Sequence, residues 1–231
     1  MGDRLWVALN NVLSLAVERD LDYRDFFLAT AAAYDEGRGS SLPIRALVRA
    51  LEEEAASCSL ERARQYAWQL VGAGYSAVVL DCLGLPELYW FYAQLLKRGL
   101  RLAVYGYVNA TGRTAGLLEE FQRASVREVA ESLGGSKSSS LDRAVHRELG
   151  EPVSLEELAR RAEEHLKPVV NGWVRQLTSL AAPFFVISDH GYDFAREGGK
   201  WYLVHGRAPN ALSKLAPLLV VSRPPRWCSS R

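Results

Sequence analysis

Residues 183–191 read Pro-Phe-Phe-Val-Ile-Ser-Asp-His-Gly, and this stretch decides the fold class. Its apolar run, residues 184–187, is short and unbroken, which predicts a strand that is covered on both faces of a parallel sheet. Asp189 and His190 follow the strand directly, and Gly191 then allows the backbone a sharp turn. We therefore expect an α/β protein in which residues of metal-ligand type emerge at a strand end.

A second apolar run of the same kind lies earlier in the chain. Residues 76–81, Ser-Ala-Val-Val-Leu-Asp, also end in a carboxylate, Asp81. A helix is expected from about 86 to 97 and a strand over 101–108, which gives a strand-helix-strand unit with parallel strands. Because open α/β sheets bind ligands beyond the carboxyl ends of their strands, we expect Asp81 and Asp189 to meet in one crevice.

The first 75 residues form a helical segment. Apolar residues recur three and four apart in residues 5–17, 26–34 and 44–51. These stripes must be buried, so we expect the segment to pack on the α/β core of residues 76–231 as part of one unit. The same helices are candidates for binding a protein partner.

Turn-rich sequence separates the remaining elements. Residues 192–205 have the pattern of a β-hairpin, and residues 218–222 form a last apolar strand. The Gly/Ser-rich residues 134–140 predict a mobile connector, and residues 125–140 a small lid. The expected fold is a three-layer α/β arrangement, with a mostly parallel sheet flanked by helices and an N-terminal helical segment.

Composition limits the classes of function. The 231 residues carry 28 Lys and Arg against 27 Asp and Glu, a net charge of +1, so nucleic acid or an anionic membrane is not indicated as a partner. We expect neither a signal peptide nor a membrane span. The three cysteines, Cys58, Cys82 and Cys228, have no paired spacing, which favours a reducing compartment and a cytoplasmic protein. Cys82 is expected to be a small buried side chain.

Candidate metal ligands are few, because the chain has only four histidines. Asp142 and His146 are four apart, so both can reach one cation from a helix. His205 follows the second hairpin strand. A pair spaced like Asp142 and His146 arises readily by chance on a surface helix, and a lone histidine at a strand end is more often structural than a ligand. The Ser-Asp-His-Gly stretch of residues 188–191 is the stronger signal.

The order of these residues resembles the alkaline phosphatase superfamily, and within it the PglZ domain. The resemblance covers roughly residues 76–222. The matching pieces are VVLDCLGLPELYW around Asp81, VNATGRTAGLLEEF around Thr111, LDRAVH around Asp142, FFVISDHGY around Asp189 and YLVHGRAPNALSKLAPLLVV around His205.

The resemblance implies two divalent metal ions. One would be bound by Asp142, His146 and His205. The other would be bound by the remaining ligands, which are Asp81, Asp189, His190 and the nucleophile oxygen of Thr111. Mixed carboxylate and imidazole ligands suit zinc or manganese, and we expect zinc before manganese. Two cations about 4 Å apart can bind the attacking and leaving oxygens of a phosphoryl transfer.

The nucleophile of the superfamily is a serine or threonine at the start of a helix. Thr111 is the expected nucleophile here, as the N-cap of a helix whose amides favour phosphate, and Thr114 is the second choice. Arg113 could clamp phosphate or be a solvated arginine. The implied activity is that of a metal-dependent phosphohydrolase or phosphodiesterase acting on a phosphate ester. The alternative is a catalytically inactive PglZ-like binding or scaffold module, of the kind associated with phage-defence systems.

Overall fold

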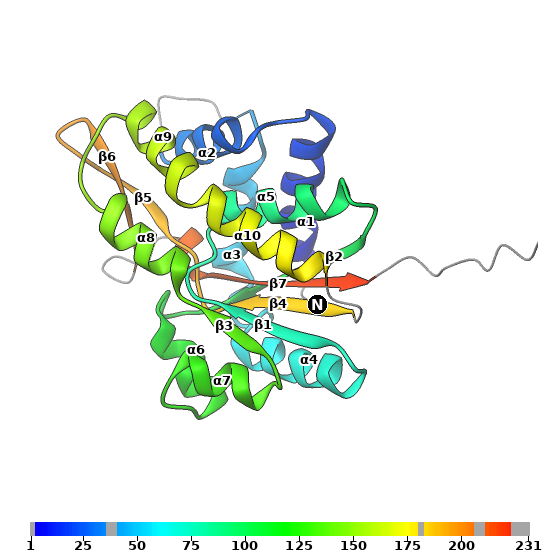
Figure 1. The fold of residues 1–231 in the computed structure, drawn as a ribbon. Helices are drawn as coiled ribbons and strands as arrows, with labels where there is room; N and C mark the ends of the chain where they lie inside the picture. Colours follow the sequence, from blue (N-terminus) through cyan, green and yellow to red (C-terminus); the bar gives the residue numbers. More distant parts are fainter. Residues whose placement is uncertain (1–2, 36–40, 180–182, 206–210, 223–231) are drawn as a thin grey trace, which may run out of the picture.

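The computed structural model describes residues 3–35, 41–179, 183–205 and 211–222, and a five-stranded sheet lies at the centre of it (Figure 1). The strands, in their order across the sheet, are β2 (Arg101–Val108), β7 (Leu215–Ser222), β4 (Phe184–Ser188), β1 (Ser76–Leu80) and β3 (Ser136–Ser138). β1 is parallel to both β3 and β4, whereas β7 is antiparallel to both β2 and β4. The sheet is therefore mostly parallel, and β7 is the one strand among these that runs the other way.

The inner strands β1, β4 and β7 are mostly apolar because helices cover both faces of the sheet. All of β4 is buried: Phe184 and Val186 belong to one hydrophobic cluster, while Phe185 and Ile187 belong to the other. The first cluster includes residues of α1 (Asp3–Glu18), α2 (Tyr23–Ala32), α3 (Ile44–Glu53), α5 (Leu85–Leu96), α8 (Ser140–Glu148), α9 (Leu155–His165) and α10 (Lys167–Thr178). The second includes α4 (Leu60–Gly72), α6 (Thr114–Phe121) and α7 (Val126–Ser132).

The N-terminal helices are divided between the two faces. α1, α2 and α3 share their cluster with sheet residues such as Val78, whereas α4 packs with Val79 on the opposite face. Figure 1 shows α4, α6 and α7 on one side of the sheet, and α1, α2, α5, α9 and α10 on the other. The helical segment is thus in contact with both faces of the sheet.

The predicted hairpin is present as β5 (Asp193–Glu197) and β6 (Lys200–Val204), which pair antiparallel as a separate small sheet. Phe194, Trp201 and Leu203 anchor it in the first cluster. The last strand, β7, begins at Leu215 rather than at residue 218. Pro217 lies within it, opposite Gly106, although a proline usually argues against continuing a strand.

Residues 134–140, predicted as a mobile Gly/Ser-rich connector, contain a short strand. Residues 136–138 form the edge strand β3, whose Lys137 pairs with Val79 of β1. The segment before it also packs tightly, because a Cβ on Gly135 would lie 2.2 Å from the carbonyl oxygen of Ala77. The expected lid of residues 125–140 is likewise part of the layered structure, since α7 buries Val129 against the sheet.

None of the helices in the described part of the chain combines the length and the apolar character needed to cross a membrane.

Candidate metal centre

The strand ends bring the predicted ligands to one edge of the sheet. β1, β2, β3 and β4 all run in the same direction, so the residues that follow them emerge together. Asp81 follows β1, Asn109 follows β2 and Asp189 follows β4. β3 leads into α8, which carries Asp142, and His205 comes directly after β6.

Asp81, Asp189 and His190 form the first ligand group. Each offers one ligand atom, and these atoms all lie within 4.8 Å of one another. His190 Nε2 is 3.4 Å from Asp189 Oδ2 and 3.9 Å from Asp81 Oδ1. All of these residues are buried. The structure therefore places three side chains from two strand ends around one point, as the sequence predicts for Asp81 and Asp189.

Main-chain contacts orient the ligands of this first group. The main-chain N–H groups of Cys82 and His190 both donate to Asp189 Oδ1, each over 3.0 Å, which leaves Oδ2 facing the imidazole. His190 Nδ1 lies 2.8 Å from the carbonyl oxygen of Gly191. Because a carbonyl only accepts, Nδ1 carries a proton, and in the neutral form of the ring Nε2 would present a lone pair. A histidine that binds a metal is usually held in this way.

The charges around this point fit a cation. Asp81 Oδ1 and Asp189 Oδ2 are buried and make no hydrogen bond within the described part of the chain. Buried polar atoms usually have a partner, and here two acceptor oxygens and a lone pair converge. Burial, followed by the charges of Asp189 and Asp142, raises the pKa of Asp81 to about 6. A divalent cation would satisfy all three ligand atoms at once.

Asp142 and His205 form the centre of a second group. His205 Nε2 lies 3.2 Å from Asp142 Oδ1, and His146 Nε2 lies 3.4 Å from the same oxygen. The contact with His205 lowers the pKa of Asp142. The ring of His205 is 4.6 Å from those of both His146 and His190, so the two groups are contiguous. His146 is the most exposed member, with 61% of its side chain accessible.

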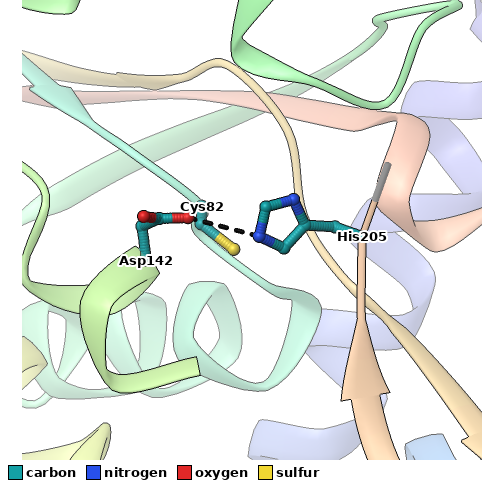
Figure 2. A group of neighbouring side chains, drawn as sticks. All are labelled: Cys82, Asp142 and His205. Carbon is teal, nitrogen blue, oxygen red and sulfur yellow. Dashed lines mark ion pairs between the residues drawn. The ribbon is translucent and has the colours of Figure 1, made fainter. Parts of the chain in front are cut away.

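Cys82 is a member of the site that the sequence analysis missed. It is buried, as expected, but its Sγ lies among the ligand atoms of Asp142 and His205 (Figure 2). Its φ of 65° is in the left-handed region, which non-glycine residues rarely adopt. Burial and the neighbouring carboxylates raise the pKa of its thiol. The one sequence signal was its position, directly after the acid that ends β1.

The two candidate hydroxyl groups differ in their contacts. Thr111 is exposed, and its Oγ1 donates to Asn109 Oδ1 over 2.8 Å. The prediction that Thr111 caps the helix is wrong, because α6 begins at Thr114 with Arg113 as its N-cap. Thr114 Oγ1 lies 3.3 Å from His190 Nε2, beside the first ligand group. Thr114 is therefore the hydroxyl that contacts a predicted ligand. Arg113 is exposed.

Asn109 holds the loop that positions Thr114, and the sequence analysis did not identify it. Its Nδ2 donates to the carbonyl oxygens of Arg113 and Asp189, over 2.7 and 2.8 Å. It therefore joins the start of α6 to the end of β4. Gly116 makes room for this amide, because a Cβ there would lie 2.3 Å from Asn109 Oδ1. The signal was the same as for Asp81: a polar residue directly after a buried strand.

A pocket of about 250 Å³ adjoins the second group. His146 and His205 line it, together with Glu151 and Tyr202. Residues of β6 form part of its wall. The remaining residues of the motif around His205, 206–210, lie outside the described part of the chain, as does Cys228.

No protein-family model matches the chain, and no curated protein or solved structure is significantly similar to it. The resemblance to the PglZ domain therefore rests on the sequence motifs, and the activity that it implies is a hypothesis.

Proposed function

We propose that this protein is a metal-dependent phosphohydrolase or phosphodiesterase with a PglZ-like fold of the alkaline phosphatase superfamily. One observation carries the proposal: two carboxylate oxygens without hydrogen-bond partners in the described part of the chain, from Asp81 and Asp189, converge with His190 Nε2 beside the hydroxyl group of a helix start. A cluster of histidine and acids with a purely structural role would not need a hydroxyl group beside it, whereas a phosphoryl-transfer site would need one as the nucleophile. The ligand types favour zinc over manganese, and we retain a cytoplasmic location as part of the proposal.

The residues present could hold two cations. Asp81, Asp189 and His190 would hold one, and the second would lie at Asp142 and His205 with His146 at the exposed side. Bound divalent cations would supply positive charge that offsets the charge of the phosphate and of the leaving oxygen. The first turn of α6 adds main-chain N–H groups without helical acceptors, which favour an anion.

Thr114 is the better candidate for the nucleophile. Its oxygen lies beside the first ligand group, whereas the oxygen of Thr111 is occupied by its hydrogen bond with Asn109. In the proposed reaction Thr114 Oγ1 forms a bond to phosphorus, and the bond from phosphorus to the ester oxygen breaks. The alcohol leaves with the proton of the Thr114 hydroxyl group. Water then hydrolyses the phosphothreonine and restores the hydroxyl group, which releases phosphate from a monoester substrate or a phosphomonoester from a diester.

A matched pair of variants tests the proposal. Thr114→Ala should lower turnover of an aryl phosphate or phosphodiester by at least about a thousandfold, because it removes the nucleophile. Its zinc content should change little, since the carboxylates and imidazoles remain. Thr111→Ala is the control, and it should keep near wild-type turnover. The reverse result would reassign the nucleophile to Thr111.

A wild-type protein that turned over none of several phosphomonoesters and diesters with zinc, manganese or magnesium would contradict the proposal. The inactive binding module would then be the better explanation.

A further inference from the structure

The thiol of Cys82 lies beside the ion pair of Asp142 and His205. Sγ of Cys82, a carboxylate oxygen of Asp142 and a ring nitrogen of His205 all lie within 4.8 Å of one another. Figure 2 shows the three side chains converging from the loop after β1, from α8 and from the end of β6. Sulfur, oxygen and nitrogen ligands from three separate elements thus share one small volume.

The main chain holds this thiol in place. Cys82 has a φ of 65°, a conformation that costs a non-glycine residue about 1 kcal/mol or more. The hydrogen bond from its N–H to Asp189 Oδ1 fixes that conformation. Sγ makes a weak contact with the carbonyl oxygen of Gly191 over 3.8 Å. A cysteine that served only as a small apolar side chain would not require a strained backbone tied to a metal-binding acid.

We propose that Cys82, Asp142 and His205 form a thiolate zinc site, in which Sγ of Cys82 is a direct ligand. This inference deepens the proposed function and depends on it for the presence of a second cation. His146 Nε2 is 3.4 Å from Asp142 Oδ1, but His146 is not among the three residues whose ligand atoms lie within 4.8 Å of one another, so water is the expected fourth ligand. The thiol proton leaves to water as the bond between zinc and sulfur forms.

The ligand types select the metal. Thiolate is a soft ligand that binds zinc well, whereas magnesium and manganese prefer oxygen ligands. The charges also balance. The carboxylates of Asp81, Asp142 and Asp189, together with the thiolate of Cys82, carry four negative charges when all are ionised, which two divalent cations would neutralise. A site of carboxylates and imidazoles alone would discriminate less between these metals.

Cobalt substitution of the full chain tests the inference without an assay of activity. Cobalt bound to a thiolate gives a near-ultraviolet charge-transfer band that oxygen and nitrogen ligands do not give. The wild-type protein should show this band, and X-ray absorption of the zinc form should show a Zn–S distance of about 2.3 Å. Cys82→Ser should lose the band. Cys58→Ser and Cys228→Ser are the matched controls and should keep it.

Two further variants test the site without changing Cys82, in case the Cys82→Ser protein loses the band because it misfolds. Asp142→Asn and His205→Gln leave the thiol in place but remove its partners, so each should weaken or abolish the band. His190→Ala removes a ligand of the first group but leaves Cys82, Asp142 and His205 in place, so it should keep the band.

Cobalt bound without a sulfur band, or a band lost in Cys58→Ser but not in Cys82→Ser, would overturn the inference and leave the proposed function standing. A sulfur band in a protein without phosphoesterase turnover would support the inference and contradict the proposed function. A chain that bound no cobalt would overturn both.

Discussion

Two regions of this protein that contain buried carboxylates have different neighbours. At the sheet edge, Asp81 and Asp189 face an imidazole lone pair and each other. On α5, the carboxylate of Glu87 is fully buried and accepts a hydrogen bond from the hydroxyl group of Tyr23. Within the described residues, both regions contain a carboxylate oxygen without a hydrogen-bond partner. The difference is that tyrosine hydroxyl groups adjoin Glu87, whereas the unpartnered oxygens of Asp81 and Asp189 adjoin each other and an imidazole nitrogen.

This difference separates two ways of burying an acid. Burial raises the pKa of Glu87 to about 7, so a proton can neutralise it within its hydroxyl-lined surroundings. One proton on Asp81 or Asp189 would leave the other acceptors of the first group unsatisfied. A cation satisfies all of them together. We therefore interpret Glu87 as structural and the acids at the sheet edge as metal ligands.

The largest expected contrast is in metal binding. Asp189→Asn should lower zinc affinity at the first group by more than about 100-fold, because losing a ligand exceeds the 10- to 100-fold loss typical of its hydrogen-bond partners. The amide oxygen can still accept the N–H groups of Cys82 and His190, so the fold should persist. Glu87→Gln should bind zinc like the wild type. Calorimetric titration measures both, and equal affinities in the two variants would contradict the comparison.

Removing zinc should also distinguish the sheet-edge acids from Glu87 by its effect on the free energy of unfolding. A cation that binds only the folded chain adds about 2.7 kcal/mol to the free energy of unfolding at a concentration 100 times its Kd. We expect zinc to stabilise the wild type and Glu87→Gln by this amount, and a chelator to remove the gain. Asp81→Asn should gain much less. Denaturant unfolding with and without zinc provides the measurement, and a wild type indifferent to zinc would refute the prediction.

The pH dependence of the free energy of unfolding should reflect the protonation of Glu87. Its pKa is raised from 4.5 to about 7 in the folded protein, so the folded chain binds this proton more tightly than the unfolded chain does. The stabilising contribution is complete at low pH and is lost as the pH rises. Between pH 5 and pH 7 we expect a loss of about 2 kcal/mol. Glu87→Gln should remove this part of the pH dependence. Unfolding with chelator at each pH tests it, and identical slopes in both proteins would contradict it.

Parts of this arrangement are readable in the sequence because the signal is local. The acids Asp81 and Asp189 each follow an apolar run, so their position at one sheet edge follows from strand direction alone. The edge strand β3 was missed because its residues, Ser-Lys-Ser, carry no apolar pattern. β1 and β2 are parallel but not adjacent, since β4 and β7 lie between them, and strand order depends on contacts distant in sequence.

The finer parts of the site depend on backbone geometry. Thr111 and Thr114 are three residues apart in one loop, and only the start of α6 decides which of them faces His190. In the sequence, Cys82 looks like a small buried core residue. The sequence does not reveal its left-handed φ or the position of its thiol beside Asp142 and His205. Neither feature has a counterpart in hydrophobic periodicity.

The smallest expected effect comes from removing one of two hydroxyl groups, those of Ser188 and Tyr192, which lie within two residues of His190 in the sequence. Ser188 Oγ donates to the carbonyl oxygen of His190 and accepts from the N–H of Leu83, so it joins the ends of β4 and β1. Tyr192 adjoins Glu87 instead. Ser188→Ala should cost about 1–2 kcal/mol of stability and lower zinc affinity about 10-fold, because the loop that carries His190 loses its support. Tyr192→Phe should cost no more than about 1 kcal/mol and leave zinc affinity unchanged. Denaturant unfolding and zinc titration of both variants measure these effects. If Tyr192→Phe lost zinc affinity to the same extent as Ser188→Ala, the region around Glu87 would be part of the support of the metal centre, and the separation of the two regions would have to be abandoned.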